Sequence, residues 1–395
     1  MGRNFIFLNI TQFLDVLNEN LFRYIVIFYL IYYQGASESS FITSVTGALF
    51  ILPFILFSTL GGFVADRWSK SKITVVTRFL QVLTFVAAFF FIVLGKQSLM
   101  YVALFITASF SSIFGPSKYG MIPEISLKEK LLKANSYVAA LTYFGVIIGT
   151  ALASVLDSIS QKNFFWMGGF CIFVAVLGFL MSLFLPKMPP SNPDKKCSLF
   201  IYREIFEALK EMRQIPSMLI ALFCYSYFVF IGAFIQMNIV PYTVNTLKMD
   251  AAIGGYLFLV SSLGIGVGSL MAPKITKTLR SLPFSCFGIS LGLFSFFFFP
   301  LPFWLNLFWL VGLGFLGGVF LVPAQYFFMS RGKEENQGRN FGCANFFSFI
   351  AAFLAALVLY LLQPVLGVSS LDSFGWVGIL NLLVAVILLF RIPRT

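Results

Sequence analysis

Hydrophobic residues gather into long stretches that are separated by short polar segments. A helix needs about 20 apolar residues to cross the hydrocarbon core of a bilayer. Twelve stretches of about this length or longer are present, near residues 4–33, 43–65, 73–94, 99–117, 135–157, 164–185, 216–244, 251–272, 283–300, 302–328, 340–362 and 373–391. The pattern predicts an all-α membrane protein with twelve transmembrane helices.

The first stretch is the least apolar of the set, because its middle carries Asp15, Glu19, Asn20 and Arg23. A secretory signal peptide has an uninterrupted apolar centre and a small-residue cleavage site, and this stretch has neither. We therefore interpret residues 4–33 as a membrane span of the protein and not as a cleaved leader.

The longest polar segment, Lys187 to Pro216, divides the twelve stretches into two sets of six. It opens with a proline-rich run that cannot be helical. Apolar residues then recur at the spacing of an amphipathic helix on a membrane surface, at Phe200, Ile201, Ile205, Leu209 and Met212. The predicted domains are a six-helix half over 1–186, a cytoplasmic linker over 187–215 and a second six-helix half over 216–395.

The two halves share an internal repeat. Pro116-Ser117-Lys118-Tyr119 follows the fourth stretch, and Pro323-Ala324-Gln325-Tyr326 stands at the end of the tenth. A charged segment and then an asparagine, Asn135 or Asn340, come after each. Parallel six-span repeats of this kind indicate a secondary transporter.

The composition narrows the functional classes. Hydrophobic residues make up 59% of the 395 residues and charged residues 11%, whereas about a quarter of a soluble domain is charged. Histidine is absent, which excludes His-ligated metals and His-based acid–base or nucleophilic sites. The five cysteines form no CxxC pair, so neither a zinc site nor a disulfide framework is expected. We expect no enzyme activity, no metal and no cofactor.

The net charge of +12 has two candidate explanations, nucleic-acid binding and the positive-inside bias of a membrane protein. With the N-terminus in the cytoplasm, 22 of the 27 Lys and Arg residues fall in cytoplasmic segments. The outer loops hold Lys96, Lys162 and Lys248, and Arg23 and Arg78 lie within spans. This imbalance predicts that both termini are cytoplasmic, and it leaves no basic face for nucleic acid.

A polar stripe in the first span is the strongest candidate for a functional site. Asn9, Gln12, Asp15, Glu19 and Arg23 follow one another at steps of three or four, which places them on one helical face. A charge at bilayer depth costs about 2.5–3.5 kcal/mol, so it marks a transport pathway by default. Two alternatives stay open. Glu19 and Arg23 can form a purely structural ion pair, and the two carboxylates of the stripe also admit proton coupling.

Two further positions are candidates for substrate contact. Lys118 can be a functional cation or an ordinary span-end lysine that reaches toward water, and the neutral Gln325 at the matched repeat position favours a functional role. Gln236 in the seventh span is polar among apolar neighbours, but such residues more often satisfy backbone groups than bind a ligand.

The loop after the second span resembles the cytoplasmic signature of the major facilitator superfamily, G-x-x-x-D-R-x-[G/S]-[K/R]-x-[K/R]. In this chain it reads Gly62 to Lys72. We expect a conformational switch in which Gly62 allows close helix approach, Asp66 pairs with a cation, and Arg67 and Lys70 hold a helix C-terminus. The matched loop of the second half has no acidic residue.

GxxxG pairs occur inside three spans, at Gly145/Gly149, Gly264/Gly268 and Gly314/Gly318. Each pair alone is a weak signal, because glycine is frequent in membrane helices. In the superfamily the fifth and eighth spans face each other, so the first two pairs are expected to let those helices slide.

The chain also resembles the lysophospholipid transporters of bacterial inner membranes along nearly its whole length. The family motifs Q-F-L and D-N, P-A-K-Y-G, L-V-K-A-N, G-F-F-V-V-P, E-R-G-K and G-A-G-N have partial matches here. The matching segments are Gln12-Phe13-Leu14, Glu19-Asn20, Pro116 to Gly120, Leu132 to Asn135, Gly318 to Pro323, Arg331-Gly332-Lys333 and Gly338-Arg339-Asn340. The combination of K-Y-G with K-A-N is far more specific than the superfamily loop.

The resemblance implies a flippase that moves lysophospholipids, such as lysophosphatidylethanolamine, inward across the inner membrane by alternating access. A cytoplasmic-side acyltransferase or acyl-carrier-protein synthetase would be its partner. Glu19, Asn20 and Lys118 would contact the head group, and Arg23, Tyr119, Gln236, Gln325 and Tyr326 complete the expected site. The chain departs from the family at Gln236, which replaces an arginine, and around Phe346–Phe349, where an acidic residue is missing.

Alternatives to this function remain. One alternative, also a membrane transporter, is a proton-coupled facilitator that exports amphipathic drugs or carries another small solute. From a different class, a membrane-embedded acyltransferase would explain a lipid link, but the absence of histidine argues against its chemistry.

Overall fold

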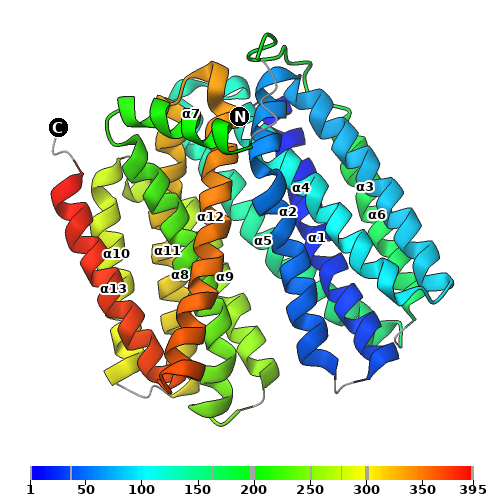
Figure 1. The fold of residues 1–395 in the computed structure, drawn as a ribbon, viewed down its shortest axis with the longest axis vertical. Coiled ribbons are helices and arrows are strands. Elements are labelled where there is room, and N and C mark those ends of the chain that lie inside the picture. Colours follow the sequence, from blue (N-terminus) through cyan, green and yellow to red (C-terminus); the bar gives the residue numbers. More distant parts are fainter. Residues whose placement is uncertain are drawn as a thin grey trace. The chain divides into compact units, whose positions relative to one another are not determined.

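A computed structural model describes residues 2–35, 38–161, 163–195, 201–249, 251–276, 278–298 and 302–392. These residues form thirteen α-helices joined by short turns (Figure 1). The helices are α1 (Arg3–Gln34), α2 (Ser39–Arg67), α3 (Lys70–Val93), α4 (Gln97–Ile125), α5 (Leu131–Ile159), α6 (Phe164–Ser182), α7 (Ile201–Gln214), α8 (Met218–Asn245), α9 (Ala251–Ile275), α10 (Leu282–Phe298), α11 (Phe303–Arg331), α12 (Gln337–Tyr360) and α13 (Ser370–Arg391).

The twelve long helices coincide with the twelve predicted spans, so the predicted fold class is confirmed. Eleven helices of the described chain are long and apolar enough to cross a membrane. The long helix outside this set is α1, which carries Asp15, Glu19 and Arg23 in its middle. The thirteenth helix, α7, has 14 residues and is too short to span.

The predicted end of the fourth span at residue 117 is wrong. Helix α4 continues to Ile125 and contains both Pro116 and Pro123. Proline is tolerated inside membrane helices because neighbouring helices and side chains satisfy the backbone groups that it frees. Lys118 therefore lies two turns inside the helix and not at its end.

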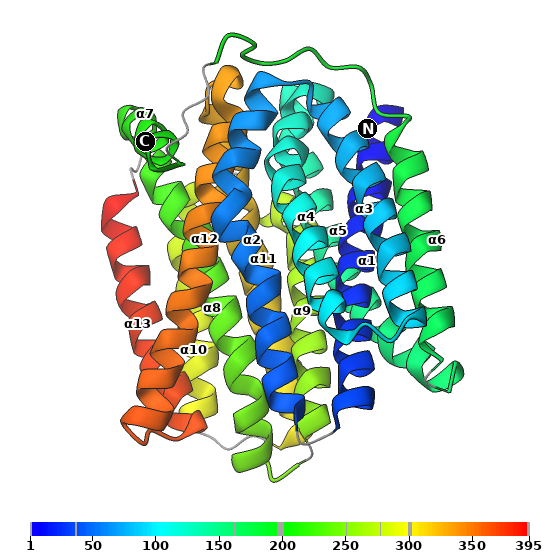
Figure 2. The ribbon, with the colours of Figure 1, turned by 45° about the vertical axis from the view of Figure 1, so that its right-hand side comes forward.

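One compact unit, unit 1, comprises Met1–Lys128, Phe144–Ala208 and Gly332–Phe346. Helix α1 packs against α4 and α6, α3 packs against α4 and α6, and α2 packs against α4 (Figure 2). The apolar core of unit 1 includes Leu21, Phe22, Tyr29, Phe85 and Phe164, all nearly inaccessible to solvent.

The second compact unit, unit 2, comprises Glu129–Tyr143, Leu209–Arg331 and Phe347–Thr395. Its closest helix pair is α9 with α11, and α10 packs against α13 (Figure 1). A Cβ atom added at Gly264 or Gly268 would lie against backbone of α11, and one added at Gly314 or Gly318 would lie against backbone of α9. Two GxxxG pairs thus bring two backbones into direct contact.

The prediction for the remaining glycine pair needs correction. Gly145 and Gly149 of α5 face α1, where a Cβ at Gly149 would meet the carbonyl oxygen of Leu17. The glycines of the fifth and eighth spans therefore serve packing inside unit 1 and inside unit 2 respectively.

The linker has two parts. Residues 187–195 are irregular and follow the turn between α2 and α3, where Met188 N donates to Ser71 Oγ (3.2 Å) and Asn192 N donates to Asp66 O (2.8 Å). Helix α7 then runs across the direction of the long helices (Figure 1), with Ile205 and Met212 buried. Phe200, Cys197 and four basic residues of the charge count (Lys162, Lys196, Lys277 and Arg394) lie outside the described residues.

Candidate functional site

The polar stripe of α1 is buried within unit 1. Asn9, Gln12, Asp15 and Glu19 are each at most 8% exposed, and Arg23 is half-buried. In the surrounding apolar bundle, such side chains are retained only when they have polar partners or a ligand. The contacts of each residue decide which of the two applies.

Asp15 is paired with Arg78 of α3, and both side chains are nearly inaccessible. The Arg78 guanidinium also lies over the Phe114 ring of α4, 4.4 Å from its centroid. This pair joins α1, α3 and α4, and neither charge is left for a ligand. The sequence alone predicts both residues inside spans, and an acid and a base at mid-span are each expected to have a partner of opposite charge.

Glu19 and Arg23 do not form the ion pair that their spacing allows. The Arg23 guanidinium lies 4.9 Å from the centroid of Phe50 on α2, although it remains near enough to Glu19 for the two charges to interact. Oε1 of Glu19 has no hydrogen-bond partner in the described chain. Ser111 and Lys118 of α4 are near enough to Glu19 to interact with it.

Lys118 is buried, with 7% of the residue exposed. Its Nζ lies 3.5 Å from Gln12 Oε1 and 4.7 Å from the centroid of the Tyr119 ring. None of the ion pairs found among the described residues includes Lys118 or Glu19. The interpretation of Lys118 as a lysine that reaches toward water does not hold, because the helix continues and the side chain stays inside.

The remaining predicted residues of unit 1 have mainly packing contacts. Asn20 Nδ2 donates to the Val16 carbonyl on its own helix (2.8 Å). The Tyr119 ring stacks on Phe341 of α12 at 4.9 Å between centroids. The structure thus brings Glu19, Lys118 and Gln12 together, with Asn20 and Tyr119 as neighbours in sequence.

The candidates from the second half belong to unit 2. Gln236 is exposed on α8, Gln325 is 2% exposed on α11, and Tyr326 beside it is half-buried. Asn238, two residues after Gln236, donates to Ser370 O (2.9 Å) and accepts from Gln363 Nε2 (2.6 Å). The candidate residues of unit 2 thus offer neutral polar groups.

The predicted switch is built around Asp66 at the end of α2. Its carboxylate accepts hydrogen bonds from the backbone N–H groups of Gly338 (2.7 Å) and Arg339 (3.0 Å), in the first turn of α12. A negative charge is stabilised at this position, because the first N–H groups of a helix are unpaired and its dipole is positive there. A Cβ at Gly62 would lie 2.5 Å from Gly338 O, so glycine is needed for the two helices to approach.

The cation on Asp66 comes from the linker. Lys195 Nζ lies 3.0 Å from Asp66 Oδ2 and 3.2 Å from Glu204 Oε2 of α7, and its side chain is 9% exposed. A second contact joins Arg339 to Glu207 of α7 at 3.4 Å. Sequence analysis counted Lys195 only among the cytoplasmic charges, because the contact joins residues 129 positions apart.

Arg67 and Lys70 lie on either side of the turn between α2 and α3. Lys70 contacts Glu124 and Ser191, so it fastens the end of α4 and the linker to the α2–α3 turn through side chains. The Arg67 guanidinium lies over the Phe63 ring at 5.9 Å. No cluster of three or more His, Cys, Asp or Glu residues suited to a metal is found in the part of the chain that the structure describes.

The sequence was compared with models of protein families. The model described as Major Facilitator Superfamily matches residues 8–356. The chain belongs to this superfamily. The expected resemblance to the superfamily is thereby confirmed, and the chain is a multi-pass membrane transporter.

Curated relatives refine the resemblance. The lysophospholipid transporter LplT of Cronobacter sakazakii is 26% identical over 376 residues, covering 91% of this chain and 89% of the relative. The protein of the same name from Salmonella heidelberg is 25% identical over 373 residues, covering 91% and 88%.

Solved structures of other superfamily transporters share the fold. The Escherichia coli fucose:proton symporter FucP has a TM-score of 0.76 at 13% identity, covering 99% of this chain and 98% of that chain. The human organic anion transporter MFSD10 has a TM-score of 0.75 at 12% identity, covering 98% and 99%. At these identities the likeness concerns the fold alone.

Proposed function

We propose that this transporter flips lysophospholipids across the inner membrane by alternating access. The observation that carries the proposal is a buried cation and a buried acid, Lys118 and Glu19, that lie near each other in unit 1. Among the residues that the structure describes, neither belongs to an ion pair. The names of the relatives, lysophospholipid transporters, support the same substrate class.

The chemistry of the head group explains why both charges are needed. Lysophosphatidylethanolamine carries a phosphate and an ammonium group, and removing either from water without a partner is costly. Lys118 donates to the phosphate, and Glu19 accepts from the ammonium. Charge-assisted hydrogen bonds are about twice as strong as neutral ones, so the pair discriminates a zwitterion from a neutral solute.

The contacts around Asp66 are the proposed conformational switch of the transport cycle. Asp66 fixes the first turn of α12 through two backbone N–H groups, and Lys195 fixes the linker to the same carboxylate. In the proposed cycle these contacts form in one end state and break in the other. Breaking them changes the relative population of the states and leaves the head-group site intact.

The proposed direction is inward, with both termini and the linker in the cytoplasm, where an acyltransferase restores the second acyl chain. Substituted cysteines at Lys195 and at Ser39 should label from opposite sides of the membrane. Labelling from one side would contradict this topology.

A second candidate is proton-coupled export of an amphipathic drug. It is favoured by Glu19, a buried carboxyl group outside any ion pair of the described chain, because such a group can take up and release a proton. Uptake of lysophosphatidylethanolamine and of a drug by the same proteoliposomes distinguishes the two substrates.

Glu19→Gln tests the role of the acid. If Glu19 binds the ammonium, the variant should impair uptake of the ethanolamine lipid more than uptake of lysophosphatidylglycerol, which has no positive charge. If Glu19 carries protons, transport should lose its pH dependence with the lipid preference unchanged. If Glu19 only balances nearby cations, both lipids should be impaired alike and the melting temperature should fall.

The control is Lys96→Gln in the exposed turn between α3 and α4 of unit 1, which removes a charge that has no part in the proposed site. It should leave uptake of both lipids unchanged. If Glu19→Gln also changes neither uptake nor melting, the α1 stripe has no role in transport.

A further inference from the structure

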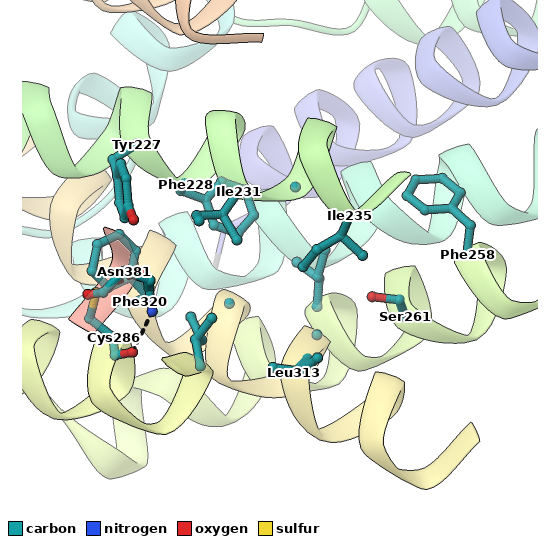
Figure 3. Close-up of a pocket in the computed structure, with 15 residues that line it drawn as sticks. Tyr227, Phe228, Ile231, Ile235, Phe258, Ser261, Cys286, Leu313, Phe320 and Asn381 are labelled. Atoms are coloured by element: carbon teal, nitrogen blue, oxygen red, sulfur yellow. Dashed lines mark hydrogen bonds between the residues drawn. The ribbon is translucent and has the colours of Figure 1, made fainter. Parts of the chain in front are cut away.

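Unit 2 encloses a small apolar cavity between α8, α9, α10, α11 and α13. Its volume is about 40 Å³. Figure 3 shows Phe228, Ile231 and Ile235 along one wall and Leu313 opposite them. Phe258 lies toward one end, and Phe320 lies beside Tyr227 and Asn381 toward the other.

Most residues in the wall of this cavity are apolar, and two of its polar residues, Asn381 and Cys286, are bonded to each other. Asn381 Nδ2 donates to the carbonyl oxygen of Cys286 (2.6 Å, Figure 3), and the Cys286 thiol contacts Asn381 Oδ1 (3.1 Å). The interior is therefore an apolar environment, suited to hydrocarbon and unsuited to a charged or sugar-like solute.

A second apolar space lies on the outside of the same helices. It is a groove of about 470 Å³ between α8, α12 and α13, lined by residues such as Leu222, Phe230 and Ile350. Its rim includes Phe223, Leu354 and Leu380, which are 46%, 45% and 39% exposed. In a membrane this rim faces lipid chains.

Tyr227 lines both spaces. Its ring is 8% exposed and stacks between Phe223 (5.5 Å) and Phe230 (5.8 Å). Its hydroxyl group, like that of Ser226, is buried without a hydrogen-bond partner among the described residues. Buried hydroxyl groups are normally bonded, and without such a bond only packing fixes the Tyr227 ring.

We propose that the cavity receives the end of the substrate's single acyl chain and that Tyr227 is a movable wall between it and the lipid-facing groove. This inference rests on the proposed function, since it names the site of the tail for the same substrate. When the ring turns aside, the cavity and the groove become continuous, and the cavity of about 40 Å³ admits only the end of one hydrocarbon chain. A second chain has no space, which gives a steric reason for selecting a lysophospholipid over a diacyl lipid.

Gly232 provides a specific test. It lines the cavity, and a Cβ atom placed there meets no atom within 4 Å. Gly232→Leu should therefore fill the cavity without a backbone clash. Gly255 on α9 is exposed, also has open space at its Cβ, and lies outside the cavity lining, so Gly255→Leu is the matched control.

The first measurement is uptake of oleoyl and octanoyl lysophosphatidylethanolamine into proteoliposomes. Gly232→Leu should lower the ratio of oleoyl to octanoyl uptake about fivefold or more, while Gly255→Leu should match the wild type. An unchanged ratio in Gly232→Leu overturns the tail site. Failure of the wild type to take up either lipid overturns the proposed function instead.

The second measurement does not depend on transport by a variant. A lysophospholipid with a photoreactive group at the end of its acyl chain is irradiated with the wild-type protein, and the adducts are mapped by mass spectrometry. We expect adducts on cavity residues such as Ile231 and Phe320, reduced in Gly232→Leu but not in Gly255→Leu. Adducts confined to lipid-facing side chains such as Phe284 and Trp304, which are 70% and 72% exposed, would refute the proposal.

Discussion

Unit 1 buries Asp15, Glu19 and Arg78 in the middle of long helices, whereas the long helices of unit 2 carry charges only in their first or last turns. The contrast is clearest at the repeat, where Lys118 of α4 corresponds to Gln325 of α11. The two repeats share a backbone plan but have diverged in chemistry. One buries charged side chains, and the other encloses an apolar cavity.

The contacts that join the helices within unit 1 also differ in kind from those within unit 2. In unit 1 the Asp15–Arg78 pair connects α1 to α3, and in unit 2 the glycines of α9 and α11 allow backbone contact. A buried ion pair fixes one geometry through charge, while a glycine contact fixes it through shape. Substitutions in the two units should therefore fail in different ways.

The largest effect is expected from Asp15→Asn. It leaves Arg78 as an unpaired buried cation, which costs about 3–5 kcal/mol when the partner of a buried pair is removed. The melting temperature of the purified protein should fall steeply. In Asp15→Leu/Arg78→Met both charges are gone, and most of the loss should be recovered. A large loss of uptake at an unchanged melting temperature would show instead that the pair takes part in transport.

The next largest effect is expected from Lys118→Gln, which gives unit 1 the residue of unit 2. A hydrogen bond to a charged group contributes about 1.5–3 kcal/mol, so uptake of lysophosphatidylethanolamine should fall by about tenfold or more, with little change in melting temperature. Gln325→Ala is the comparison in the other repeat and should have a smaller effect. Equal losses in both variants would contradict the functional asymmetry of the repeats.

A moderate effect is expected at the switch. Asp66→Asn and Lys195→Gln should each lower the transport rate about threefold to tenfold, with lipid binding largely retained, because both act on the equilibrium between end states. Since the two side chains are in contact, the double variant should be less impaired than the sum of the single effects. Additive effects, or parallel loss of binding, would remove Lys195 from the switch.

The smallest effect is expected from Arg203→Gln on the exposed face of α7. Arg203 and Glu207 form a surface pair at 3.0 Å, with side chains 71% and 43% exposed. Such pairs contribute about 0.5 kcal/mol or less, so melting and uptake should stay close to wild type. A marked loss of uptake would mean that α7 acts through this face.

The spans were predictable because lipid imposes a length and a composition on every crossing helix. The hydrophobic pattern locates α8 and α13 to within a few residues. It fails at the end of α4, where Pro116 reads as a helix boundary although the surrounding helices allow the helix to continue to Ile125.

The contacts of the site were less predictable. Spacing along α1 allowed an ion pair between Glu19 and Arg23, but Arg23 stacks on Phe50 of a neighbouring helix. The partners of Asp15 and Asp66 are Arg78 and Lys195, which are 63 and 129 residues away. One helix reveals which side chains share a face, but the partner of that face depends on how helices pack.

The low hydropathy of α1 has a consequence for synthesis. Each charge at the centre of a span opposes insertion by about 2.5–3.5 kcal/mol, and each Leu, Ile, Phe or Val favours it by only about 0.3–0.6 kcal/mol. The emerging α1 is thus a weak membrane segment, and its ion-pair partner Arg78 lies on α3, two helices later in the chain. We expect α1 to be stably inserted in the membrane only after α3 has emerged from the ribosome. The first helix to be synthesised would then be among the last helices of unit 1 to insert stably.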